Sequence, residues 1–161
     1  SRALSRELVI CARILNGIRK PQKKADRTVI GTPVTDCGSA VGNFTKLTIS
    51  SCTGSESVCP LKRNTNVTLE IIFTTTVVDS SVKADVHGII QGVPIPWNIP
   101  SPDACVNSGL TCPLQPGQQY HYTKTFLILN AYPKMSLLVK WELKNQRGED
   151  IICASIPVKI E

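Results

Sequence analysis

The chain has 161 residues and a formal net charge of +6. This length allows one domain, whose core would bury about two-thirds of the surface that the unfolded chain exposes. The charge lies at one end, because residues 1–30 hold eight basic and two acidic side chains, whereas residues 31–161 hold ten of each. Binding of nucleic acid needs clustered positive charge, so the neutral domain excludes that class of function.

Residues 1–31 are predicted to be a basic leader, separate from a domain at residues 32–161. Apolar residues recur in the leader at helical spacing between arginines, which is typical of a short amphipathic helix on an anionic membrane. The alternative is a disordered segment that is unrelated to the function of the domain. The longest apolar run, Leu8 to Ala12, is too short for a secretory signal, and no segment approaches the length of a transmembrane helix.

From about residue 32 onward the apolar pattern has a period of two, which indicates β-strands. The alternation is clearest at residues 67–73, 137–143 and 152–160, and less regular strands are predicted at residues 44–50, 82–90 and 120–129. Turn-forming clusters separate the strands, for example Asp79-Ser80-Ser81 and Pro116-Gly117. Short strands and turns at this density predict an all-β protein, an antiparallel β-sandwich.

Six of the seven cysteines fall into one distant pair and two near pairs, and Cys11 lies in the leader. Each near pair encloses six residues that include turn formers. Among the fifteen connectivities that six cysteines allow, the spacing favours Cys37–Cys153, Cys52–Cys59 and Cys105–Cys112. Zinc ligation is the alternative, but zinc sites prefer two to four intervening residues, so no metal site is expected. Disulfides persist in oxidising compartments, which predicts a secreted protein or one of the endolysosomal lumen.

Two Asn-x-Ser/Thr sequences, at Asn43 and Asn66, are acceptors for N-glycosylation. In a secreted protein each would place its asparagine at the surface. The motif is short and occurs by chance, so it agrees with secretion without establishing it.

The sequence contains little catalytic machinery. It lacks the Gly-x-Ser-x-Gly elbow, a phosphate-binding glycine loop and the His-Glu-x-x-His motif. His87 is a candidate general base with Asp85 or Asp103 to orient it, because Asp85 and His87 lie two residues apart on a strand and share a face. A polar strand face is the favoured interpretation. The chain is therefore expected not to be an enzyme and to need no cofactor.

The stretch 88–102 combines four prolines with six large apolar residues. Because proline cannot donate a hydrogen bond to a sheet, this stretch is predicted to be an edge strand or a rigid extended loop. Its apolar side chains suit a preformed rim beside an apolar opening. The alternative is that they only close one end of the sandwich.

Several short sequences follow one another in a characteristic order over residues 36–161: Asp36-Cys37-Gly38-Ser39, Val86-His87-Gly88, Gly92-Val93-Pro94-Ile95-Pro96, Pro102-Asp103, Cys112-Pro113, Tyr132-Pro133, Val139-Lys140-Trp141-Glu142-Leu143 and Ile156-Pro157-Val158. Together they resemble the lipid-recognition (ML) domain family, and within it the sterol carriers. The resemblance implies an immunoglobulin-like sandwich of about seven strands, an apolar lipid tunnel between its sheets, and the three disulfides named above. Residues 1 to about 31 have no counterpart in the family.

The resemblance also implies which residues bind the lipid. The mouth of the tunnel is expected at five of them: Trp97, Ile128, Tyr132, Ile95 and Phe126. The interior is expected to be lined by five others: Trp141, Val139, Val67, Leu69 and Ile71. The alternation agrees with the second set, since Val139 and Trp141 share one strand face and the other three share another. Ala154 stands where the sterol carriers of vertebrates have a tryptophan, which predicts a wider pocket.

The function implied is that of a soluble, monomeric carrier. It is expected to bind one sterol or long-chain fatty acid and to transfer it to a membrane or a membrane lipid transporter. The alternative is a co-receptor of innate immunity that recognises microbial lipids. The neutral domain argues mildly against that alternative, because phosphorylated microbial lipids favour a basic rim. No nucleic-acid partner is expected.

Overall fold

The structure, a computed structural model, describes residues 26–29, 32–53 and 55–161. Ten strands are present in these ranges: β2 (Asp26–Val29), β3 (Thr32–Asp36), β4 (Gly42–Ile49), β5 (Cys59–Leu61), β6 (Thr65–Thr75), β7 (Val82–Ile90), β8 (Val93–Pro96), β9 (Gln119–Ile128), β10 (Ser136–Asn145) and β11 (Asp150–Ile160). These residues include no helix, and so none that could cross a membrane.

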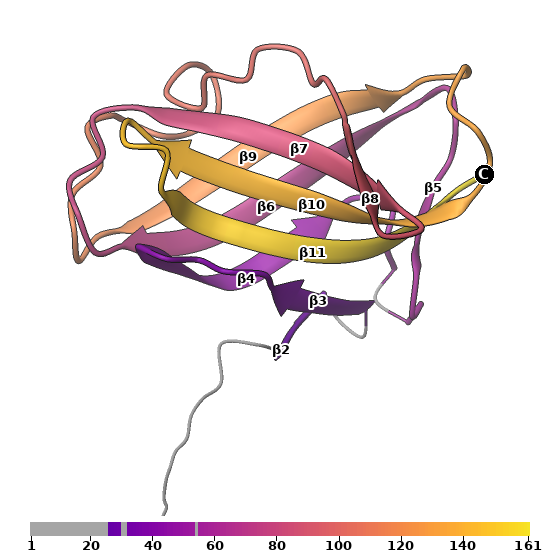
Figure 1. Cartoon of the computed structure of the whole chain (residues 1–161), viewed down its shortest axis with the longest axis horizontal. Coiled ribbons are helices and arrows are strands. Elements are labelled where there is room, and N and C mark those ends of the chain that lie inside the picture. The colour runs from indigo at the N-terminus through magenta and orange to yellow at the C-terminus, as the bar shows by residue number, and fades with distance from the viewer. Residues whose placement is uncertain (1–25, 30–31, 54) are drawn as a thin grey trace, which may run out of the picture.

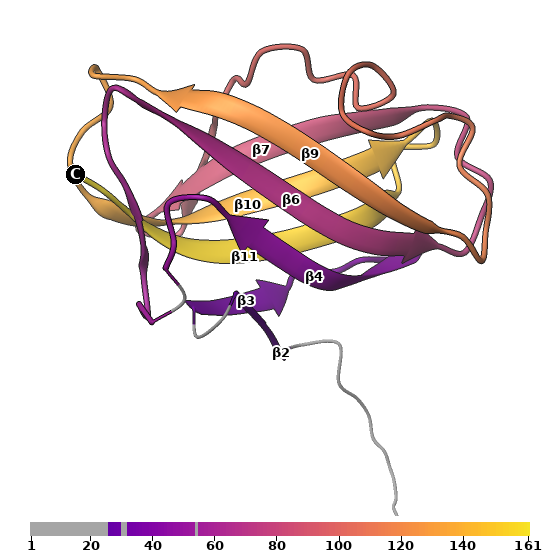
Figure 2. The same cartoon turned by 180° about the vertical axis from the view of Figure 1, so that it is seen from behind.

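The strands form two sheets that pack face to face (Figure 1). The larger sheet has the order β2-β3-β11-β10-β7-β8, with β5 paired to β11, and the smaller has the order β4-β6-β9. Figure 2 shows the smaller sheet from its own side, with its strands crossing over those of the larger sheet. Every pair is antiparallel except β5 with β11. The predicted antiparallel β-sandwich is thereby confirmed.

The core lies between the sheets because the inward positions of the long strands are apolar. On β6, Val67, Leu69, Ile71 and Phe73 are all buried, whereas the residues between them are half-buried. Such alternation lets one face of a strand join the core while the other meets solvent. On β10, Trp141 packs against the ring of Phe126 from the smaller sheet, so the core spans both layers.

Six of the strands correspond to the six stretches predicted from the alternation. The alternation misses four short strands, β2, β3, β5 and β8, although β8 lies in the stretch predicted to be an edge strand or an extended loop. β2 begins at Asp26, within the predicted leader, and pairs with β3 through its backbone. This pairing supplies backbone partners along the outer edge of β3, which would otherwise carry unpaired groups. The predicted amphipathic helix lies outside the described residues.

Three disulfides connect the fold: Cys37–Cys153, Cys52–Cys59 and Cys105–Cys112. They join the same pairs that the cysteine spacing favours. The first ties the end of β3 to the middle of β11, and the others close short loops. The two glycosylation candidates both lie on the smaller sheet, with Asn66 exposed on β6 and Asn43 half-buried on β4.

The proline-rich stretch contains the edge strand β8, which pairs only with β7 among the described strands. Gln91 and Gly92 form the tight turn between these strands, with φ angles of 50° and 80°. Two consecutive residues with positive φ match the twist of a two-residue hairpin. The outer side of β8 needs no ladder partner, so its prolines are tolerated there. The hairpin positions the chain that follows it, including Trp97, at one end of the sandwich.

Candidate functional site

An apolar cavity of about 380 Å³ opens at one end of the sandwich. β7, β8, β10, β11 and the two loops that follow β8 and β9 all contribute side chains to it. Its lining residues are Gly88, Ile90, Ile95, Pro96, Trp97, Asn98, Leu129, Tyr132, Pro133, Met135, Leu137 and Ile160. We call this space the outer cavity.

A second space lies deeper between the sheets and has a volume of about 10 Å³. We call it the inner void, and its lining is wholly apolar: Ile49, Leu61, Leu69, Trp97, Phe126, Val139, Trp141, Ile156 and Val158. Its volume is about the least that one water molecule requires. Apolar side chains close such spaces because every gap loses dispersion contacts.

Trp97 lines both spaces, so it lies where the outer cavity and the inner void meet. The predicted tunnel thus corresponds to two spaces that share Trp97 in their linings. The indole N–H donates a hydrogen bond to the Tyr132 hydroxyl at 2.8 Å. The ring meets Tyr132 and Phe126 edge to face, with centroid distances of 5.4 and 5.8 Å. These contacts hold the indole across the entrance to the interior.

Hydrogen bonds to the backbone hold the segments that carry Trp97 and Tyr132. The Trp97 amide donates to the Val86 carbonyl at 2.8 Å, which fixes the chain after β8 to β7. Arg63 Nη1 donates to the carbonyl oxygens of Asn130 and Tyr132 at 3.1 and 3.2 Å. The guanidinium thus fixes the loop that carries Tyr132, a role that sequence reasoning missed because Arg63 and Tyr132 are distant in the chain.

The ten predicted lipid-binding residues fall into three groups. Trp97, Ile95 and Tyr132 line the outer cavity. A second group lines the inner void: Phe126, Val139, Trp141 and Leu69. Ile128, Val67 and Ile71 are buried in the core and line neither space.

Sequence reasoning missed several residues of the outer cavity, notably Leu129, Met135, Leu137 and Ile160. Leu137 and Ile160 belong to predicted strands, but alternation alone does not show which strand ends meet at an opening. Leu129 is the last residue of the predicted strand 120–129, but β9 ends one residue earlier, at Ile128. Beyond that point the alternation does not determine the direction of a side chain.

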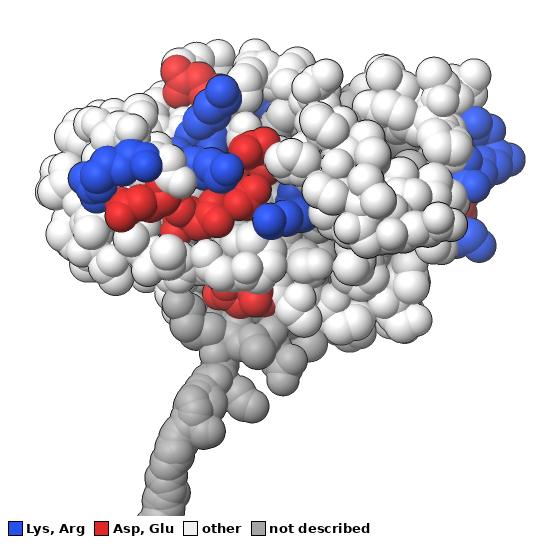
Figure 3. All heavy atoms as spheres, in the orientation of Figure 1, with Lys and Arg blue, Asp and Glu red and all other residues white. Residues whose placement is uncertain are grey.

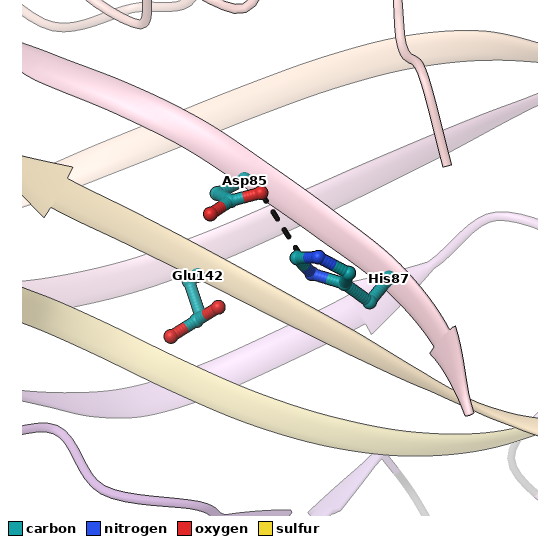
Figure 4. A group of neighbouring side chains, drawn as sticks. All are labelled: Asp85, His87 and Glu142. Carbon is teal, nitrogen blue, oxygen red and sulfur yellow. Dashed lines mark ion pairs between the residues drawn. The ribbon is translucent and has the colours of Figure 1, made fainter. Parts of the chain in front are cut away.

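The catalytic candidates lie elsewhere, on the outer face of the larger sheet. Figure 3 shows acidic and basic side chains interleaved there. Asp85 and His87 project from β7 toward Glu142 on β10, as Figure 4 shows, with His87 Nδ1 3.7 Å from Asp85 Oδ1. Asp103 pairs with Lys83 through a backbone bridge. None of these residues lines the outer cavity or the inner void.

The ligand atoms of Asp85, His87 and Glu142 lie within 4.8 Å of one another, close enough to hold a metal ion. Lys144 already occupies this neighbourhood, however, with its ammonium 3.0 Å from Asp85 Oδ2 and 4.0 Å from Glu142 Oε1. Burial pushes the pKa of Asp85 upward, but the hydrogen bond and charge of Lys144 outweigh it and lower that pKa. A fixed positive charge at this position repels a metal cation, so the group is better described as an ion-pair network.

Asp150, next to this network, has its pKa raised to about 7 by burial and by a hydrogen bond to Glu142, whose negative charge adds to the effect. Because the pKa is higher in the folded chain than in the unfolded chain, the folded state holds this proton more tightly. The resulting stabilisation is complete below about pH 4 and is lost as the pH rises through about 7.

We expect Asp150→Asn to remove this part of the pH dependence. The Asp150 carboxyl should make the wild-type chain melt at a higher temperature at pH 5 than at pH 8. The variant should be more stable than the wild type at pH 8, because asparagine needs no proton to stay neutral. Thermal melts between pH 4 and pH 8 measure both effects. Asp103→Asn, at an exposed carboxylate, is the control and should keep the wild-type slope. If the melting temperature of Asp150→Asn depended on pH as in the wild type, the raised pKa of Asp150 would be contradicted.

Comparison with known proteins places the chain among close relatives. The family model of the ML domain matches residues 31–160. The NPC intracellular cholesterol transporter 2 homolog a of Drosophila melanogaster is 48% identical over 126 residues, which are 78% of this chain and 85% of that protein. The NPC intracellular cholesterol transporter 2 of Bos taurus is 35% identical over 126 residues, 78% of this chain and 83% of that protein.

Among solved structures, a Niemann-Pick type C2 protein from the Japanese carpenter ant matches with a TM-score of 0.76 and 37% sequence identity. The match covers 78% of this chain and 97% of that chain. The similarity therefore extends over nearly the whole of that protein.

Proposed function

Because the chain belongs to the ML domain family, as its motifs predicted, we propose that it is a secreted carrier that holds a single lipid between its sheets. The favoured ligand is a sterol, and a long-chain fatty acid ranks second. The names of the relatives, cholesterol transporters of an insect and a mammal, support lipid transport. The carrier domain is the region from residue 32 to residue 161.

The observation that carries this proposal is an apolar cavity that leads to an apolar interior, with one aromatic side chain between them. A volume of about 380 Å³ lies in the usual range of small-molecule sites. Burial of a lipid gains about 25 cal/mol per Å² of apolar surface, or about 0.8 kcal/mol for each buried methylene, less the cost of ordering the chain. A longer ligand enters the interior when Trp97 moves aside and the sheets part.

The rim of the outer cavity suggests how the lipid leaves. Two of its large apolar side chains are exposed, Ile95 at 46% and Leu129 at 43%. Ile95 is on the hairpin strand β8, and Leu129 follows β9, so the two come from the two different sheets. Exposed apolar side chains beside an apolar opening are typical of a surface that docks on a membrane or on a partner protein. Release at such a contact spares the lipid a passage through water.

The three disulfides support secretion or an endolysosomal location, because such bonds persist in oxidising compartments. They also tie loops and strands around the interior, so the sheets can part locally while the framework remains connected. No covalent step is needed for uptake or release.

Two neighbouring leucines on β10 provide a matched test of the site. Leu137 lines the outer cavity, whereas Leu138 faces the other side of the sheet and is 43% exposed. Leu137→Trp should fill the cavity and weaken lipid binding at least about tenfold, a loss of roughly 1.4 kcal/mol. Leu138→Trp should leave binding unchanged.

The measurement is a titration of each variant with a fluorescent sterol and a fluorescent fatty acid, with displacement by the unlabelled lipids. Thermal melts check that both variants remain folded. Equal affinities in Leu137→Trp and the wild type would place the lipid elsewhere. The relative affinity for the two lipids decides which class is the better ligand.

A further inference from the structure

The deepest part of the interior contains two polar atoms in otherwise apolar surroundings. They are the indole nitrogen of Trp141 on β10 and the hydroxyl of Tyr122 on β9. Both side chains are buried, with about 1% of each residue exposed. Their rings meet edge to face across the two sheets, with centroids 6.3 Å apart.

These two groups cannot satisfy each other completely. The indole carries a donor hydrogen and no acceptor, and the phenol carries one donor hydrogen and one acceptor oxygen. The Trp141 N–H has no hydrogen-bond partner of good geometry among the described residues. It does lie close enough to the Tyr122 hydroxyl to lower the pKa of that group slightly, against the larger rise that burial causes. If the N–H donates to the phenol oxygen, the phenol still keeps its own hydrogen to donate. Buried donors without acceptors are rare, because each one forfeits its hydration.

The position of the pair relates it to the path of a ligand. Phe126 lines the inner void and packs on Trp97 at the entrance and on Trp141 further in. Tyr122 lies four residues before Phe126 on β9, which is about 13 Å farther from the mouth at about 3.3 Å per residue. A lipid that enters past Trp97 therefore reaches Trp141 and Tyr122 with its leading end.

We propose that this pair binds an oxygen atom on the buried end of the lipid. The proposal rests on the carrier function proposed above and narrows its ligand class. The acceptor is neutral, a hydroxyl or carbonyl oxygen, because the inner void is lined by apolar side chains and an ionised group would lose its hydration there. The favoured ligand is thus a lipid with an oxygenated tail, whereas a plain hydrocarbon tail leaves the donor unsatisfied.

Matched fatty acids test this directly, since their carboxylate stays at the mouth. We would titrate the full chain with saturated acids of about 14 to 18 carbons and with the same acids hydroxylated at the far end. Several lengths are used so that the terminal hydroxyl of one of them reaches the pair. The wild-type protein should bind each hydroxy acid at least as tightly as the plain acid. In Tyr122→Phe the hydroxy acid should bind about tenfold more weakly than in the wild type, while the affinity for the plain acid stays within about twofold.

Two further variants complete the design. Trp141→Phe removes the other donor but keeps an aromatic ring, and it should also weaken the hydroxy acid selectively. Tyr120→Phe is the control, because the Tyr120 hydroxyl lies on the same strand but already accepts from the Gln115 amide and donates to Gln118. It should behave as the wild type with both acids.

The outcomes separate the two proposals. If plain acids bind but hydroxy acids bind about tenfold more weakly to the wild type, as expected for a purely apolar site, the inference is overturned and the carrier function stands. Equal losses for both acids in Tyr122→Phe would overturn it as well. If neither acid nor a sterol binds, the carrier function falls, and the inference falls with it.

Discussion

Trp141→Ala should lower the free energy of unfolding by about 3–5 kcal/mol, the cost typical of removing a large aromatic side chain from a core. Trp141 is almost fully buried, and it packs against Phe126 and Tyr122 from the opposite sheet. Alanine would leave a cavity between the two layers that neighbouring strands cannot fill without moving. Because Trp141 also lines the inner void, lipid affinity should fall too.

Urea denaturation followed by circular dichroism measures this loss. Trp141→Phe is the graded control and should cost clearly less, since phenyl fills most of the same space. A loss below about 0.5 kcal/mol for Trp141→Ala, the level of an ordinary surface change, would show that the two sheets do not depend on this contact.

Trp97→Ala should act mainly on the ligand. We expect it to remove about 2–4 kcal/mol of lipid binding, roughly a 30- to 1000-fold loss of affinity. The indole covers the entrance to the interior and lines both spaces there. The free energy of unfolding should fall by less than in Trp141→Ala, because Trp97 is only partly buried.

Tyr132→Phe tests the hydrogen bond of Tyr132 separately from its ring. It removes the acceptor of the Trp97 N–H but keeps the edge-to-face contact, so binding should change by only about 0.5–1.5 kcal/mol. Titrations with a fluorescent sterol compare the lipid affinities of the variants, and thermal melts compare their stabilities. Unchanged lipid affinity together with a strongly lowered melting temperature in Trp97→Ala would identify Trp97 as a core residue and move the entrance elsewhere.

The sequence predicted the long strands because burial on one face leaves a period of two. β6 illustrates this, since Val67 to Phe73 alternate as expected. The pattern is less informative on β10 and β11, where Glu142 and Cys153 face outward and are still buried. Both strands have neighbours on either side, and the Cys37–Cys153 bridge and the ion-pair network cover their outer face.

The site was predicted less completely than the fold. The motifs identified Trp97 and Tyr132, which meet at the entrance. They placed Ile128 at the mouth, whereas Ile128 is buried and its neighbour Leu129 lines the outer cavity. The strand ends at Ile128, so the direction of the next side chain depends on the loop. Cavities at strand ends depend on registers between distant strands, which no local pattern contains.

The most direct test of the central claim is native mass spectrometry of the protein after incubation with an excess of sterol or fatty acid. A carrier of this design should gain the mass of one lipid per chain, and Leu137→Trp, with its outer cavity filled, should gain little or none. A wild-type chain that takes up no lipid, or that gains several lipids regardless of the Leu137 substitution, would contradict a single site between the sheets.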